Sequence, residues 1–403
     1  MSAPRTTAWP LVALFTAGYL APYLMPTTVG RLDAGLPLSA SQAGAIGSAL
    51  LLGSATAGFV LASRVERLGA RRLARTGLAL AFAGYGCAAL TGTVALVVAG
   101  AILGGFGSGT ATAVAATGIA AQHNPHRTTT LGLLSVSALA GAVYLTVPHL
   151  GQGHGQPLAA IALTALAVWP LTTRLPRHTP VPQTRRTAKT PLPHLRAGLL
   201  LAATLPCWSL AQNALWGVSG RIGLTQAHLT EATVGAVFAT ALGAGLLGVV
   251  GAGALGPRLG YALPIGGGTA LIAACVILSA SATDLTTFAT GEIAWNLLYP
   301  IVLSYVIGLA ASLDPRGRWA VLVGSASSLG TAAGPLTGSV LAAQAGFPTM
   351  GLILAAGLLL IAVPMTATAR RAGNRTMPVV EITVEASAVP AQHAYETAAV
   401  APL

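Results

Sequence analysis

Charge is the component that this chain lacks most. Only 7% of its 403 residues are Asp, Glu, Lys or Arg, whereas 54% are hydrophobic. A soluble globular domain carries about 25% charged residues, because its surface must interact with water. The shortage of charge therefore argues against a soluble fold and favours a protein that exposes its surface to lipid.

The chain is also poor in cysteine and in motifs for catalysis. Its three cysteines, Cys87, Cys207 and Cys275, lie in apolar stretches without the short spacing of metal sites or disulfides. The sequence has no His-Glu-x-x-His run and no Gly-Lys-Ser/Thr phosphate loop, so ATP is not expected to drive this chain directly. Gly-Val-Ser-Gly at 217–220 matches intramembrane proteases over only four small residues. We predict no enzyme, no cofactor and no metal site.

Long apolar stretches are what the chain has in abundance. Most of them reach the ~20 residues that a helix needs to cross the hydrocarbon core of a bilayer. Twelve such stretches occur, at roughly 9–30, 42–63, 74–92, 94–121, 128–149, 157–173, 197–220, 232–254, 261–282, 285–311, 319–343 and 347–369. We therefore predict an all-α integral membrane protein with twelve transmembrane helices.

Positive charge is distributed very unevenly between the two sides that these helices define. Of the 21 Lys and Arg residues, only Arg31 and Arg221 fall on one side. Because positive loops stay in the cytoplasm, both termini are predicted to be cytoplasmic, in a multi-pass protein of the inner (plasma) membrane. The net charge of +12 lies in loops that flank apolar spans, so it indicates contact with membrane lipids and no nucleic acid.

The two halves of the chain resemble each other. Glu-Arg-Leu-Gly at 66–69 follows the second span, and Pro-Arg-Leu-Gly at 257–260 follows the eighth. Matching loops also precede the fifth and eleventh spans. Parallel six-helix halves of this kind are a transporter architecture. We predict these parts: an N-terminal six-helix bundle at 1–173, a basic cytoplasmic linker at 174–196, a C-terminal six-helix bundle at 197–370 and a disordered cytoplasmic tail at 371–403.

The loop after the second span carries a recognisable motif. It offers Gly58, Ala62, Glu66, Arg67, Gly69, Ala70, Arg71 and Arg72. With the six-plus-six spans, this run resembles the major facilitator superfamily, whose pattern has Gly and Asp where this chain has Ala62 and Glu66. The eleventh span also carries a pattern common in that family, at Gly330, Gly334, Pro335 and Gly338.

The resemblance implies a gate at the cytoplasmic end. Its residues would be Glu66, Arg67, Gly69, Arg71 and Arg72, with Gly69 permitting the tight turn. The carboxylate of Glu66 would face the start of the eleventh helix, and the arginines would hold the halves together in the outward-facing state. The alternative is that the arginines only fix the orientation of the chain.

Glu292 is the only acid that falls well inside a predicted span. A carboxylate at that depth must face a cavity or a partner. We expect it to take part in proton coupling or to bind a cationic substrate; the alternative is a structural pair with Arg31 or Arg221. The Arg that proton-coupled drug exporters of the superfamily carry in the fourth helix is absent, because Ala101 stands at that position.

Aromatic and amide side chains cluster in the helices that line the central cavity in this superfamily. Such side chains suit an organic molecule with an apolar body and few polar groups. The candidate cavity residues are Tyr19, Tyr23, Trp208, Gln212, Asn213, Trp295, Asn296 and Tyr299. Tyr23 and Trp216 could instead be anchors at the membrane interface.

The sequence thus predicts a secondary active transporter of a small organic solute. Proton-coupled export by alternating access, as in an efflux-like subgroup, is favoured because signatures of sugar and peptide importers are absent. The alternatives are an importer or uniporter, or a protein of another class, namely a non-transporting membrane protein or a membrane enzyme. The expected partners are the substrate, protons and membrane lipids, and the expected state is a monomer.

Overall fold

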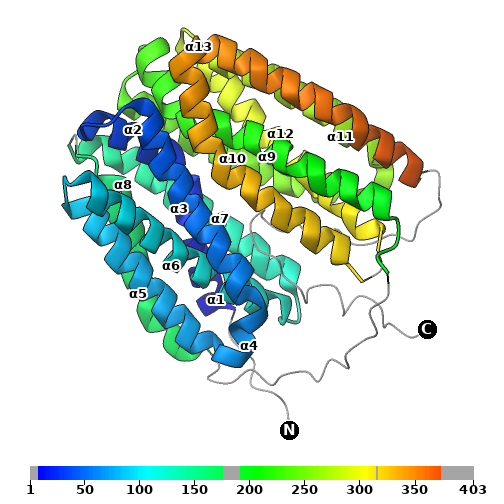
Figure 1. Ribbon diagram of the computed structural model, residues 1–403, viewed down its shortest axis with the longest axis horizontal. Helices are drawn as coiled ribbons and strands as arrows, with labels where there is room; N and C mark the ends of the chain where they lie inside the picture. Colours follow the sequence, from blue (N-terminus) through cyan, green and yellow to red (C-terminus); the bar gives the residue numbers. More distant parts are fainter. Residues whose placement is uncertain (1–7, 152, 176–190, 315, 374–403) are drawn as a thin grey trace.

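The apolar stretches form helices, because lipid offers the backbone no hydrogen-bond partners and a helix satisfies its own. A computed structural model describes residues 8–151, 153–175, 191–314 and 316–373 (Figure 1). The N-terminal half contains α1 (Trp9–Tyr23), α2 (Met25–Gly35), α3 (Ala40–Leu61), α4 (Val65–Leu68), α5 (Ala70–Leu90), α6 (Val94–Ala120), α7 (Pro125–Thr146) and α8 (Gln156–Val168). The C-terminal half contains α9 (Leu195–Arg221), α10 (Glu231–Leu255), α11 (Ala262–Ala280), α12 (Leu285–Ser312) and α13 (Arg318–Gly373).

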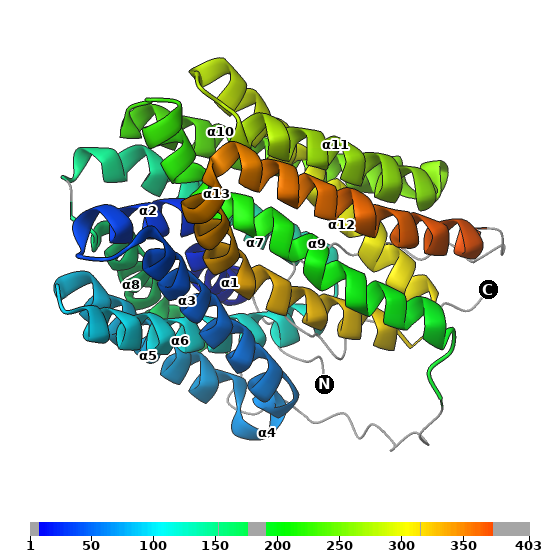
Figure 2. The same cartoon turned by 45° about the horizontal axis from the view of Figure 1, so that its top comes forward.

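These helices account for the twelve predicted spans. Among the described residues, nine helices are long and apolar enough to cross a membrane, and the α1–α2 pair, bent by 50°, makes a tenth. Two predicted spans lie within α13, which is broken where Gly346 adopts a φ of 77°. The remaining span is α9, which is more polar but packs within the bundle beside α13 (Figure 2). The predicted fold of twelve helices in two halves is confirmed.

The bundle has two chemically different ends. Loops at 36–39, 91–93, 150–151 with 153–155, 227–230 and 281–284, with the break at Gly346, lie at what we term the arginine-poor end. The opposite, arginine-rich end carries α4 and the C-terminal end of α13 (Figure 1). The helix boundaries agree with the predicted spans to within about four residues, apart from the first span, where α2 continues to Gly35, and the sixth, where α8 ends at Val168 and a 3₁₀ turn continues to Arg174.

Small residues allow the helices to approach closely. A Cβ atom at Gly105 of α6 would overlap the carbonyl oxygen of Leu50 in α3, and one at Gly330 of α13 would overlap that of Pro206 in α9. Close backbone approach is the main source of packing energy between helices in lipid, where no hydrophobic effect drives association. Most of the predicted linker and tail falls at 176–190 and 374–403, outside the described residues.

Candidate functional site: a central cavity beside a buried carboxylate

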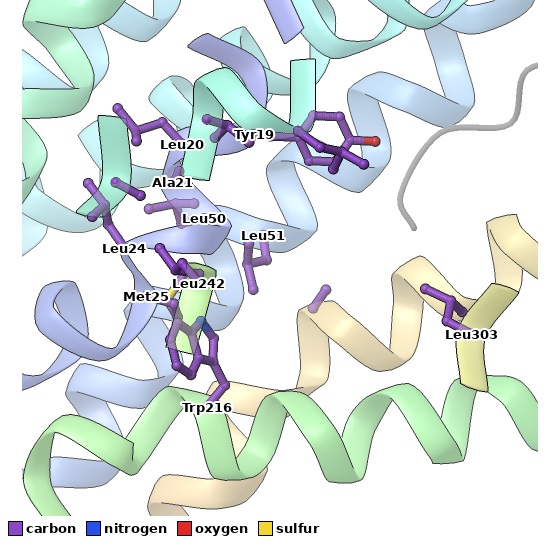
Figure 3. Close-up of a cluster of buried hydrophobic side chains, with 14 of the residues drawn as sticks. Tyr19, Leu20, Ala21, Leu24, Met25, Leu50, Leu51, Trp216, Leu242 and Leu303 are labelled. Carbon is purple, nitrogen blue, oxygen red and sulfur yellow. The ribbon is translucent and has the colours of Figure 1, made fainter. Parts of the chain in front are cut away.

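A cavity of about 190 Å³ lies between the two halves. The N-terminal half lines it with Tyr19, Pro22, Tyr23, Leu51, Ser54, Ala55, Leu133 and Ser137. The C-terminal half contributes Asn213, Trp216, Leu242, Gly245, Leu246, Val249, Trp295, Asn296, Tyr299, Pro300, Leu303, Ser328 and Thr331. Figure 3 shows the ring of Trp216 extending from α9 towards Met25 and Leu242.

Most of the predicted cavity residues do line this space. They are Tyr19, Tyr23, Asn213, Trp295, Asn296 and Tyr299. The prediction is corrected for Trp208 and Gln212, which are fully buried behind the cavity wall. Their face of α9 is turned towards α11 and α12, so Trp208 donates to Thr269 Oγ1 at 3.3 Å and Gln212 accepts a bond from the Trp295 indole.

Several lining residues were missed by sequence reasoning. Trp216 was considered as an interface anchor, but its indole lines the cavity and donates to the carbonyl oxygen of Pro22 at 3.1 Å. Ser54, Ser137 and Thr331 also line it, from α3, α7 and α13. Single hydroxyl residues are common in transmembrane helices, so nothing in the sequence marks these three as facing a cavity.

Aromatic rings form a continuous wall on the side of the C-terminal half. The ring centroids of Trp216 and Trp295 are 5.5 Å apart, and those of Trp295 and Tyr299 are 5.9 Å apart. Behind them, Trp208 stacks on Tyr299 with centroids 5.2 Å apart. These separations are typical of favourable aromatic pairs, so each ring is held in position by its neighbours.

Glu292 is completely buried one turn from this wall. Its Oε1 atom lies 2.7 Å from Ser219 Oγ and 2.5 Å from Ser279 Oγ. Its Oε2 atom has no hydrogen-bond partner in the part of the chain that the structure describes. An acid in this setting has a free oxygen to hold a proton and two hydroxyls that can donate to it when it is ionised.

These contacts bear on two interpretations from the sequence: the pairing of Glu292 with Arg31 or Arg221, and the protease-like Gly-Val-Ser-Gly run. Arg31 and Arg221 pair with other acids, so the structure does not show Glu292 as their partner. Ser219, the serine of the Gly-Val-Ser-Gly run, is buried in α9 and lies within hydrogen-bond distance of Leu215 O and Glu292 Oε1. One hydroxyl proton can serve only one of these acceptors at a time.

Two ion pairs join the halves at the arginine-poor end. Arg31 Nε of α2 lies 2.7 Å from an oxygen of Glu231 at the start of α10, and Arg221 Nε of α9 lies 3.1 Å from Asp33 of α2. The polarity is reciprocal, because each half supplies one arginine and one acid. Arg31 Nε lacks hydrogen-bond geometry in this pair, whereas Arg31 Nη2 donates to Glu231 Oε2 at 2.9 Å.

Arg31 is also held firmly within its own half. The side chain is only 3% exposed, and its Nη1 atom donates to Gly151 O at 2.6 Å and Gln156 Oε1 at 2.8 Å. The guanidinium is therefore fixed before it meets Glu231. Elsewhere between the halves, the hydroxyl of Ser48 in α3 accepts a bond from the backbone N–H of Leu336 in α13 at 2.9 Å.

The predicted cytoplasmic gate lies in the short loop that includes α4. Gly69 adopts a φ of 87° at the end of α4, which is the turn that glycine permits. Arg67 and Arg72 are exposed, Arg71 is half-buried, and the side chain of Glu66 lies outside what the structure describes. The role of these residues as a gate stays a prediction.

Comparison with known proteins shows the same fold at low sequence identity. The human organic anion transporter MFSD10 (TETRAN) is 16% identical, with a TM-score of 0.67 over 90% of this chain and 100% of that one. The nucleoside transporter NupG is 14% identical, with a TM-score of 0.67 over 90% and 99%. The peptide transporter POT, in complex with alafosfalin, is 16% identical, with a TM-score of 0.66 over 91% and 95%.

The substrates named for these three proteins differ, so the shared fold does not select a substrate. No curated protein sequence matches the chain. A sequence profile of the Major Facilitator Superfamily matches residues 4–315, which is well over half of the chain, and the protein therefore belongs to that superfamily.

Proposed function

We propose that this protein is a secondary active transporter that exports a small organic solute in exchange for protons. The observation that supports it best is Glu292, a fully buried acid beside the cavity. Burial of a carboxylate disfavours its ionised form, whereas hydrogen bonds from hydroxyls such as Ser219 and Ser279 favour it. The two effects oppose each other, so the site suits an acid that gains and loses a proton during transport.

The position of Glu292 supports coupling between proton and solute. Asn296, one turn further along α12, lines the cavity and donates from Nδ2 to the backbone oxygen of Glu292 at 3.0 Å. Ser219 lies on α9 less than one turn from Trp216, another lining residue. Protonation of Glu292 changes its hydrogen bond to Ser219, and with it the packing of α12 against α9, two helices that form the cavity wall. Proton and solute then change each other's affinity by the same factor.

The ion pairs at the arginine-poor end support alternating access. With positive loops in the cytoplasm, this end faces outward, and the structure corresponds to a state closed to the outside. Opening there requires breaking the pairs Arg31–Glu231 and Asp33–Arg221, while the loop that carries Arg67 closes the other end. The two gates therefore bias one conformational equilibrium in opposite directions.

The proposal is tested by solute movement in inside-out vesicles with an acidic interior. The probes are uridine, salicylate, dialanine and arbutin, which cover nucleoside, anion, peptide and uncharged aromatic chemistry. The wild type should accumulate at least one probe and consume the pH gradient. Glu292→Gln should still exchange that probe downhill but should not accumulate it, because a neutral amide mimics the protonated acid.

The control is Asp284→Asn, which removes an exposed acid that bonds within its own helix to Thr287. It should behave as the wild type does. Accumulation by Glu292→Gln that depends on pH as in the wild type would reduce Glu292 to a structural residue and overturn the proposed coupling.

A further inference from the structure

The cavity lining contains no charged side chain in the part of the chain that the structure describes. The nearest acid, Glu292, lies behind the wall and is 0% exposed. An ionic ligand would leave water for a site with no opposite charge on its surface, which is costly. An uncharged ligand avoids that cost, so the lining selects for neutral molecules.

Two asparagines give the cavity a defined hydrogen-bonding character. Asn213 Nδ2 donates to Ser209 O at 2.9 Å, and Asn296 Nδ2 donates to Glu292 O at 3.0 Å. Each bond ends on a backbone carbonyl, which only the NH₂ group can meet, so the orientation of each amide is fixed chemically. Both side-chain oxygens accept no bond among the described residues and remain available to a ligand. Asn213 Nδ2 also donates to Thr331 Oγ1 at 3.4 Å, so both of its N–H groups are used, whereas Asn296 keeps one N–H. Both amides therefore present an acceptor oxygen to a ligand.

The shape of the site favours a flat molecule. Trp216, Trp295 and Tyr299 form a wall of rings along the C-terminal half, and Leu51 and Leu133 line the opposite side. Aromatic faces prefer to stack on other planar rings. An apolar cavity of ~150 Å³ holds benzene, so the 190 Å³ here suits two fused rings or one substituted ring.

We propose that the cavity binds an uncharged, planar aromatic molecule of one or two rings that donates an O–H or N–H to the side-chain oxygen of Asn213 or Asn296. This inference rests on the proposed transport of a small organic solute and names its chemical class. A ligand that lacks the donor leaves the amide oxygens unpaired once water has been displaced. Sites built to hydrogen-bond a ligand discriminate strongly against analogues without that group.

The test uses four naphthalenes that differ at one substituent, with the purified full-length protein in lipid nanodiscs and equilibrium dialysis at pH 7. The probes are 2-naphthol, 2-methoxynaphthalene, 2-naphthoate and 2-naphthylmethylammonium. We expect 2-naphthol to bind roughly five- to tenfold more tightly than the methyl ether, which corresponds to one hydrogen bond. The anion and the cation should bind more weakly than either neutral compound.

Variants locate the binding site. The variant that removes the accepting oxygen, Asn213→Ala or Asn296→Ala, should reduce the preference for 2-naphthol over the methyl ether, and the double variant should abolish it, with little change in the affinity for the ether itself. Asn124→Ala is the matched control, because this asparagine caps α7 outside the cavity. Trp295→Ala should weaken both neutral probes alike.

Three results would overturn the proposal: tightest binding of a charged probe, equal binding of naphthol and its ether, or no binding of any of the four. Dialysis involves no gradient, so its outcome does not depend on whether transport is coupled to protons. Failure of proton coupling appears instead in the Glu292→Gln vesicle assay.

Discussion

The ion pair between Arg31 and Glu231 should control how often the arginine-poor end opens. Glu231→Gln removes the negative charge but keeps the size of the side chain. Arg31 then remains 3% exposed, opposite a neutral amide. The closed state loses an attraction that the open state does not have, so the equilibrium should shift towards opening at this end.

The size of the shift follows from the surroundings of the pair. Removing one partner of a fully buried pair costs about 3–5 kcal/mol. The cost is smaller here, because Glu231 is 26% exposed and Arg31 keeps its bonds to Gly151 and Gln156. A net effect of about 1–3 kcal/mol remains, which is about a 5- to 150-fold change in the equilibrium between the two states.

Pulsed electron paramagnetic resonance can measure this change directly. Spin labels at Pro37 and Ala345, both exposed at the arginine-poor end, report the distance between the two halves. The native cysteines Cys87, Cys207 and Cys275 are first replaced so that only the introduced sites are labelled. In Glu231→Gln, the ratio of the long-distance to the short-distance population should rise by the factor above.

Three further variants make the result decisive. Asp284→Asn removes an acid from the same end without breaking an inter-half pair, and it should leave the distances unchanged. Asp33→Arg should open the end as well, and adding Arg221→Asp should restore closure by rebuilding the pair with reversed polarity. The reasoning is refuted if Glu231→Gln leaves the distances unchanged, or if Asp284→Asn opens the end equally.

Three other predictions concern the rest of the molecule. Glu66→Ala or Arg67→Ala should strongly reduce transport but leave substrate binding in dialysis largely intact; normal transport by both variants would limit this loop to a role in topology. Gly330→Val should lower the melting temperature in nanodiscs by several degrees, because a Cβ would overlap the backbone of α9, at a cost of about 1–3 kcal/mol or more. Gly251→Val, where a Cβ meets nothing within 4 Å, is the control, and equal melting of the two variants would contradict the packing argument. A reporter that works only in the cytoplasm should be active when it is fused within 174–196. Activity of a reporter that works only outside the cell would contradict the proposed orientation.

The sequence alone determined the features that depend on local composition. The apolar stretches predicted twelve helices, because the thickness of the bilayer sets the length of each stretch, and the uneven distribution of arginine predicted their orientation. The superfamily was recognisable from the loop at 62–72 and the internal repeat. Glu292 stood out because it is a lone acid within a span, and an acid there requires a partner wherever the helix packs.

Only the tertiary structure decided which side chains meet. The partner of Arg31 is 200 residues away in the sequence, and Ser219 is 73 residues from Glu292. Such pairings depend on the rotation of each helix about its own axis. From Trp208 to Gly220 nearly every position of α9 is buried, so periodicity could not show that Asn213 faces the cavity whereas Gln212 faces α12. Packing of the whole bundle sets that rotation, and with it the chemistry of the cavity.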